Sequence, residues 1–114
     1  MKKEIGKRGE ELAAKFLERE GYTIFERNYR FEKGEIDIIA YKNDEIIFVE
    51  VKTSETENYL KPSERISGKQ QEMLQRTAYA YLYERKLTDF PARFDLIIVE
   101  LATGEVFHYE NVFF

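Results

Sequence analysis

The sequence contains no cysteine, and its one histidine is His108. Without cysteine the chain forms no disulfide, no thiolate metal site and no cysteine nucleophile, and this composition is typical of a reducing cytoplasm. No stretch approaches the roughly 18 consecutive apolar residues of a membrane-spanning helix, and the basic start lacks the apolar run of a signal peptide. We therefore expect a cytoplasmic protein that does not bind membranes.

Positive charge is also scarce, above all in the middle of the chain. The formal net charge is −4, which argues against indiscriminate attraction to nucleic acid. Residues 31–60 carry three Lys or Arg and eight Asp or Glu. Residues 1–30 carry eight basic and six acidic residues, and residues 61–86 carry six basic and three acidic residues. An acidic centre between basic flanks is typical both of a metal-binding cleft with phosphate-contacting walls and of ordinary surface charge.

The hydrophobic content of 43% in 114 residues predicts a single domain, residues 1–114, with its own core. Helical spacing, helix caps and apolar runs predict the following elements in chain order: a helix over 4–20, strands over 22–31, 36–41 and 46–53, a helix from 67 to about 86, and strands over 93–101 and 106–109. The first three strands form an antiparallel meander, and the helical crossover places the strand 93–101 parallel to a neighbour inside the sheet. The predicted fold class is therefore α/β, with a mixed sheet.

The second and third strands form a hairpin in which the numbers of opposed residues sum to 87. A two-residue and a four-residue connection both give this register, which places Asp37 opposite Glu50 and Glu35 opposite Lys52. One face is wholly apolar and collects Ile36, Ile38, Ala40, Ile47, Val49 and Val51. The other face carries four large apolar residues and then the charges at one end, whereas a solvated face would be polar along its length.

Two opposed carboxylates, with Cβ atoms about 5 Å apart, repel each other unless positive charge lies between them. A divalent cation and Lys52 are the candidates for that charge. Mg²⁺ prefers one or two carboxylates together with water, so Asp37 and Glu50 are candidate ligands, and the backbone carbonyl of Val51 is a third. Phosphodiester hydrolysis needs such a cation, and Lys52 can orient the attacking water or stabilise the transition state.

The helices supply further candidates. Glu10 shares the inward side of the first helix with Leu17, and it is either an acid of the site or a first-turn acid favoured by the helix dipole. Lys69, in the first turn of the second helix, adds its charge to the free N–H groups there and is a candidate phosphate contact. Arg8 and Arg76 are the remaining candidates for contact with nucleic acid.

Two other features have more than one interpretation. The polar segment 54–64, which contains Pro62 and lacks periodicity, is either a flap at the mouth of the acid site or an ordinary linker. His108 lies on the last predicted strand with no ligand residue near it in the sequence, and we interpret it as structural.

The order of elements, with an aspartate on the second strand and Glu-x-Lys on the third, resembles the PD-(D/E)xK nuclease superfamily. More closely, "GKRGEELAAKFLEREGY", "RNYRFEKGEIDIIA", "FVEVKTS" and "RFDLIIVE" resemble motifs of the YraN-like family of uncharacterised bacterial proteins, whose fold is similar to that of archaeal Holliday junction resolvases. The four motifs occur in order and span nearly the whole chain. Two positions depart from the pattern. Ile36 precedes Asp37, where the PD-(D/E)xK pattern has a proline, and Ser54 follows Lys52-Thr53, where many relatives carry a basic residue.

This resemblance implies a restriction-endonuclease-like core and an endonuclease that uses Mg²⁺ or Mn²⁺. By position it implies that Asp37 and Glu50 are metal ligands, that Lys52 is the catalytic lysine and that Glu10 is an auxiliary acid. The implied partner is nucleic acid, structured or branched DNA above all, and resolvase-like enzymes generally need two sites, which favours a homodimer. Two alternatives stay open: a nucleic-acid-binding module that keeps the metal cleft without cleaving, and a structural partner protein that binds no metal.

Overall fold

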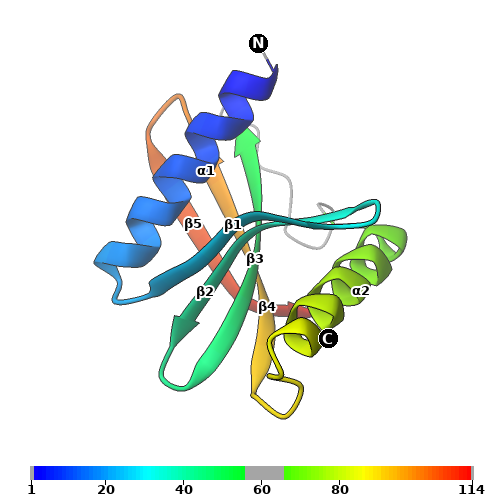
Figure 1. The fold of residues 1–114 in the computed structure, drawn as a ribbon. Helices are drawn as coiled ribbons and strands as arrows, with labels where there is room; N and C mark the ends of the chain where they lie inside the picture. The colour runs from blue at the N-terminus through cyan, green and yellow to red at the C-terminus, as the bar shows by residue number, and fades with distance from the viewer. Residues whose placement is uncertain (1, 56–65, 114) are drawn as a thin grey trace.

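A computed structural model describes residues 2–55 and 66–113 of the chain. Within these residues the elements follow the predicted order α-β-β-β-α-β-β (Figure 1). Their bounds are α1 Lys2–Arg19, β1 Thr23–Phe31, β2 Gly34–Lys42, β3 Glu45–Ser54, α2 Gly68–Glu84, β4 Ala92–Glu100 and β5 Glu105–Phe113. The predicted fold class is confirmed, and β5 extends beyond its predicted end at Tyr109. No helix in the described part of the chain is long and apolar enough to cross a membrane.

The strands form one sheet in the order β1-β2-β3-β4-β5. The first three strands are the predicted antiparallel meander, and β4 pairs with β3 in the parallel direction. Because β5 pairs with the other side of β4, β4 lies inside the sheet, as its continuous apolar sequence predicts.

Each helix covers one face of the sheet with its own hydrophobic cluster. On the α1 face, the buried residues of the helix are Ala13, Ala14 and Leu17, and they pack in the cluster that contains Ile38, Ala40, Ile47, Val49, Ile97 and Val99. On the α2 face, the buried apolar residues of the helix are Leu74, Ala78 and Tyr81, and they pack in the cluster that contains Ile36, Ile39, Ile46, Phe48, Leu96 and Ile98. The central strands are therefore buried on both faces, which leaves little room for charge except at the ends of strands.

The β2–β3 hairpin has the predicted register, since Ile39 is paired with Phe48. The strands are joined by a two-residue turn of Asn43 and Asp44, which have φ angles of 52° and 61°. Positive φ at both central residues is typical of the type I′ turn, whose twist matches that of a hairpin, and Asn and Asp tolerate it well.

β2 and β3 separate beyond the pair formed by Ile38 and Val49, which is the last in their register. From that point β2 stays paired with β1, whereas β3 stays paired with β4 as far as Ser54. Figure 1 shows the separation: β3 runs toward the start of α1, and the β1–β2 pair turns toward α2. The sheet therefore opens between its second and third strands at one end.

This separation makes three details of the predicted hairpin wrong. Asp37 and Glu50 are not a register pair, since the register ends at Ile38 and Val49, although their side chains still interact. Ile36 does not lie on the α1 face but packs in the α2 cluster, because the alternation of side chains is interrupted at Asp37, just beyond the last β2–β3 pair. Glu35 is not paired with Lys52 but accepts a hydrogen bond from Arg30 Nε at 2.9 Å. These errors arise because the prediction extended the antiparallel register past the residue where the strands part.

Two glycines let the helices pack closely against the strands that border this opening. A Cβ at Gly9 of α1 would lie 2.0 Å from Oγ1 of Thr53, and a Cβ at Gly34 of β2 would lie 1.9 Å from Oγ1 of Thr77 in α2. Real Cβ atoms essentially never come within 3.0 Å of another heavy atom in this way. The glycines therefore set the spacing between helix and sheet at both sides of the opening.

We expect Gly9→Ala to lower the free energy of unfolding by about 1 to 3 kcal/mol, because the added methyl group overpacks the contact with Thr53. Gly6→Ala, three residues earlier in the same helix, is the matched control, since a Cβ there meets no atom within 4 Å. The control should gain up to about 1 kcal/mol from the better helix propensity of alanine. Urea denaturation measures both values, and equal stability of the two variants would contradict the close contact at Gly9.

Candidate active site

A cavity of about 600 Å³ lies where β2 and β3 separate. Its walls come from the first half of α1, the start of β2, the end of β3 and the first turns of α2. It is lined by all five residues that were predicted as catalytic or metal-binding: Glu10, Asp37, Glu50, Val51 and Lys52. We call this cavity the acid cleft, because three of those five residues carry carboxyl groups.

Asp37 bridges the two separating strands. Its side chain is buried, and its Oδ2 accepts a hydrogen bond from the backbone N–H of Val51 at 2.8 Å. This bond joins β2 to β3 beyond the end of their backbone register. The N–H and C=O of one strand residue point toward the same neighbouring strand, so the carbonyl of Val51 also faces β2, as its predicted role as a ligand requires.

Burial and the neighbouring Glu50 raise the pKa of Asp37 to about 8. Burial is the largest cause, and a hydrogen bond with Glu50 and repulsion from its charge add to it, while the N–H of Val51 acts in the opposite direction. The two carboxyls therefore lie close together, and Asp37 holds its proton more tightly than an ordinary aspartate does. The sequence predicted this unfavourable approach of two acids.

Glu50 has two partners on the same oxygen atom. Lys52 Nζ lies 3.4 Å from Oε2, and Gln70 Nε2 donates a hydrogen bond to Oε2 at 2.5 Å. Gln70 was not predicted as a site residue. Its backbone N–H donates to Oγ of Ser67 at the start of α2, and a residue in such a cap is usually interpreted as structural. The helical spacing of Gln70 from Leu74, which is buried on the inner side of α2, is the signal that points to the cleft.

Glu10 reaches the cleft from α1. Its Oε1 accepts a hydrogen bond from Asn28 Nδ2 at 2.8 Å. Asn28 has a φ of 53°, a left-handed conformation that Asn adopts more readily than most residues. Burial raises the pKa of Glu10, the hydrogen bond from Asn28 lowers it, and repulsion from Asp37 raises it further. The charge of Glu10 is thus coupled to that of the central acid pair.

The three cations predicted to contact nucleic acid, Arg8, Lys69 and Arg76, are exposed and do not line the acid cleft. Lys69 was predicted to lie on the inner side of α2 together with Leu74, Thr77 and Tyr81. These three residues are buried, but Lys69 is exposed, and Gln70 is the first-turn residue of α2 that lines the cleft.

The predicted flap over residues 54–64 is described only at its start. Ser54 ends β3, and Glu55 lines the acid cleft. Residues 56–64, with Pro62 among them, lie outside the described residues.

His108 does not line the acid cleft, and its contacts agree with the structural role predicted for it. Its Nε2 lies 2.7 Å from Oδ2 of Asp95, whose side chain also accepts hydrogen bonds from Arg93 and from the backbone N–H of Asn111. Burial by itself raises the pKa of Asp95, but these three partners lower it below its ordinary value. The network joins β4 to β5 and satisfies its buried acid completely.

The donors of the acid cleft suit a hard cation that takes few protein ligands. Across residues 2–55 and 66–113, no three His, Cys, Asp or Glu side chains are grouped so as to hold a metal. The cleft offers two facing carboxyls, Asp37 and Glu50, and the backbone carbonyl of Val51. Mg²⁺ typically takes one or two carboxylates and keeps several waters, so these residues fit Mg²⁺ or Mn²⁺ better than metals that need several nitrogen or sulfur ligands.

The raised pKa of Asp37 makes stability depend on pH. Between its ordinary value of 3.8 and about 8, the folded protein holds a proton that the unfolded chain has lost, so stability falls as pH rises through this window. Asp37→Asn mimics the protonated acid. In metal-free buffer we expect this variant to match the wild type near pH 4 and to exceed it by about 1 kcal/mol above pH 8.

Urea denaturation across this pH range, in the presence of EDTA, measures the difference. The matched control is Asp89→Asn, which removes an exposed carboxyl outside the cleft and should leave the pH dependence unchanged. Strong destabilisation of Asp37→Asn at every pH would mean that the carboxylate of Asp37 serves only as a structural hydrogen-bond acceptor.

Known bacterial proteins are similar to this chain over nearly its whole length. Residues 9–99 match the family described as "Uncharacterised protein family UPF0102". A UPF0102 protein of Alkaliphilus metalliredigens is 40% identical over 111 residues, which cover 97% of each chain. UPF0102 proteins of Alkaliphilus oremlandii and Dictyoglomus turgidum are 43% and 41% identical, covering 99% and 95% of this chain and 100% and 92% of theirs. The chain therefore belongs to the UPF0102 family, the YraN-like family that its sequence motifs resemble.

Proposed function

We propose that this protein is a Mg²⁺- or Mn²⁺-dependent nuclease that hydrolyses phosphodiester bonds in structured or branched DNA. The observation that carries the proposal is the approach of the buried carboxyl of Asp37 to the half-buried carboxyl of Glu50, in one cleft with Lys52 beside them. Two facing acids form an unfavourable pair in a protein without metal. A divalent cation between them turns the same pair into a favourable ligand set.

The residues of the acid cleft have separate roles in this proposal. Asp37 and Glu50 would hold the cation, which would neutralise phosphoryl oxygens and make a bound water more acidic. Gln70 donates a hydrogen bond to Oε2 of Glu50 and so orients its carboxylate, and Lys52 lies beside the same oxygen. Glu10 lines the cleft from α1, where it would reach the cation through water.

Lys52 has the position expected of a group that acts on substrate. Its distance of 3.4 Å from Glu50 exceeds that of a well-formed N–H···O hydrogen bond, so the ammonium group is held near the carboxylate without being locked to it. Its side chain is 30% exposed at the mouth of the cleft. From there it can donate to the attacking water or to a phosphoryl oxygen as negative charge develops.

A homodimer would present two acid clefts to one branched substrate, which is the arrangement that the resemblance to resolvases implies. The alternative is a nucleic-acid-binding module that keeps the metal cleft but does not cleave. Both functions require the carboxyl pair, so cleavage itself is the measurement that separates them.

We expect Lys52→Ala to abolish cleavage, with a loss of at least about 100-fold in rate, because this variant removes the group that acts on the water or the transition state. It should keep its fold and its affinity for Mg²⁺, since Lys52 is not a ligand. The assay compares both proteins on branched, duplex and single-stranded DNA in Mg²⁺ or Mn²⁺.

Lys15→Ala is the control, since Lys15 is exposed, does not line the cleft and was not predicted to contact nucleic acid. Unchanged turnover in Lys52→Ala would overturn this mechanism. Metal and DNA binding by the wild type without any cleavage would favour the binding module.

Metal should also change stability. With a dissociation constant on the order of 1 mM, about 10 mM Mg²⁺ would stabilise the wild type by about 1.4 kcal/mol. The gain should be larger at pH 8 than at pH 6, because the cation has to displace the proton of Asp37, whose pKa is raised. Asp37→Asn should gain little, whereas Asp89→Asn should gain as much as the wild type. Thermal melts at fixed ionic strength measure these differences, and no shift in the wild type with either cation would rule out the metal site.

A further inference from the structure

A second polar hollow lies between α1 and β1, next to the acid cleft. Its volume is about 660 Å³. Four cationic residues line it: Lys3, Lys7, Arg27 and Arg30. We call it the α1–β1 groove. Gly6, Glu10 and Glu35 line both this groove and the acid cleft, so the two hollows are adjacent.

Outside the pair formed by Arg30 and Glu35, the groove carries more basic than acidic charge. Glu35 accepts a hydrogen bond from Arg30 at 2.9 Å, which pairs one acid with one cation. Glu10 accepts a hydrogen bond from Asn28, whose neutral amide leaves the charge of Glu10 in place. The ion pairs within the described residues involve neither the two lysines of the groove nor Arg27. Three cations are therefore left in the groove, against two acids, Glu10 and Glu11.

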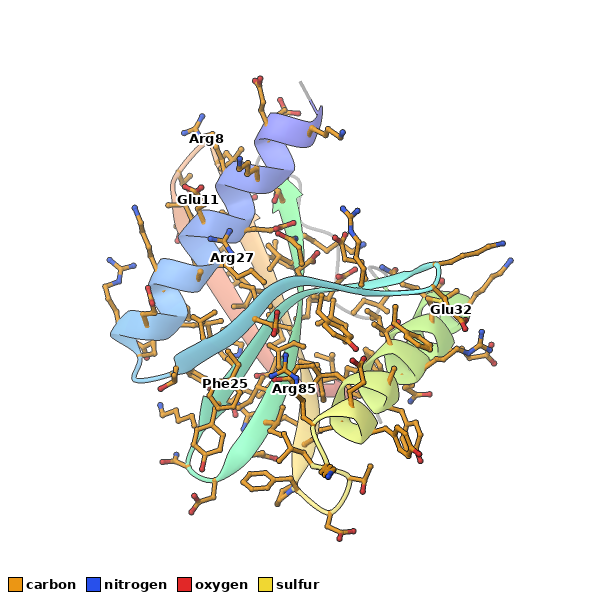
Figure 2. The ribbon with its side chains drawn as sticks, in the orientation of Figure 1. Arg8, Glu11, Phe25, Arg27, Glu32 and Arg85 are labelled. Atoms are coloured by element: carbon orange, nitrogen blue, oxygen red, sulfur yellow. The ribbon has the colours of Figure 1, made fainter. Side chains whose placement is uncertain are left out.

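The unpaired cations come from both walls of the groove. Lys3 and Lys7 are one turn apart on α1 and so lie on the same side of that helix. Arg27 comes from β1, and Figure 2 shows it beside α1, while Arg8 projects from the helix in another direction. The charge of Arg27 reaches the edge of the acid cleft, where it acts against the burial that raises the pKa of Glu10.

We propose that the α1–β1 groove binds the phosphodiester backbone of the nucleic acid strand whose scissile phosphate lies in the acid cleft. This inference rests on the proposed nuclease function and specifies the path of its substrate. A nucleic acid backbone carries regularly spaced negative charges, which match cations on two facing walls. Because the net charge of the protein is −4, only a local group of cations such as this one can attract that backbone. The path therefore runs along α1 and β1, and not along the exposed Lys69 and Arg76 of α2.

The test measures binding by the full-length protein in EDTA, where metal-dependent cleavage cannot occur. The probes are fluorescein-labelled single-stranded, duplex and four-way-branched DNA, single-stranded RNA of the same sequence, and vesicles rich in anionic lipid. The test variant is Lys7→Gln/Arg27→Gln. Its matched control is Lys15→Gln/Arg19→Gln, which removes the same two kinds of charge at exposed positions of α1 that do not line the groove.

We expect the groove variant to bind the preferred oligonucleotide at least about 10-fold more weakly than the wild type at about 100 mM salt. The slope of log K against log salt should shrink by about 1.4 to 1.8, the value for two lost phosphate contacts. The control should change affinity less than about two-fold and leave the slope unchanged. Thermal melts should show that both variants keep the fold, and comparison of the DNA and RNA arms identifies the kind of backbone.

Equal losses in the two variants would overturn the groove assignment, because they would reflect net charge alone. Binding of the wild type to anionic vesicles but to no oligonucleotide would overturn it as well. Cleavage is scored separately in Mg²⁺ or Mn²⁺. If the wild type binds through the groove but never cleaves, the groove stands and the proposed function fails. If the wild type cleaves and the groove variant binds and cleaves equally well, the groove assignment fails and the proposed function stands.

Discussion

The hydrogen bond from the backbone N–H of Val51 to the carboxyl of Asp37 is the interaction on which the site depends. It lies where β2 and β3 lose their register and turn toward different neighbours. The side chain of Asp37 therefore spans the opening between the two strands. Asp37 is buried and also lines the cavity. The same placement brings Asp37 against Glu50 and raises its pKa. The opening of the sheet and the raised pKa of Asp37 thus both result from the separation of β2 and β3.

Close packing of the helices completes the cleft from both faces of the sheet. Gly9 lets α1 approach Thr53 of β3, and Gly34 lets α2 approach β2. Because of these contacts, Glu10 and Gln70 reach the acid pair from opposite sides of the sheet. Gly9 and Gly34 have no side chain of their own, yet the close packing they allow brings Glu10 and Gln70 to the cleft.

The structure treats its two buried aspartates in opposite ways. Asp95 accepts hydrogen bonds from Arg93, His108 and a backbone N–H, and these partners lower its pKa despite burial. Asp37 faces another acid, and both that acid and burial raise its pKa. The first arrangement is complete and ties two strands together. The second places two acids beside each other, next to the α1–β1 groove that Lys7 and Arg27 line.

Local periodicity and turn chemistry were enough to predict the order of the elements and the register of the central hairpin, because they specify strands and their pairing. The sequence also predicted that Asp37 lies near Glu50, but the two acids meet where the strands have separated and not as a register pair. The point where the hairpin opens depends on tertiary structure, because β3 continues along β4, which is remote in sequence, while β2 stays with its neighbour β1. The side-chain orientation of Ile36, the partner of Glu35 and the contact of Gln70 with Glu50 all follow from that opening. The α1–β1 groove likewise exists only once a helix and a strand lie side by side, and no local pattern encodes their distance.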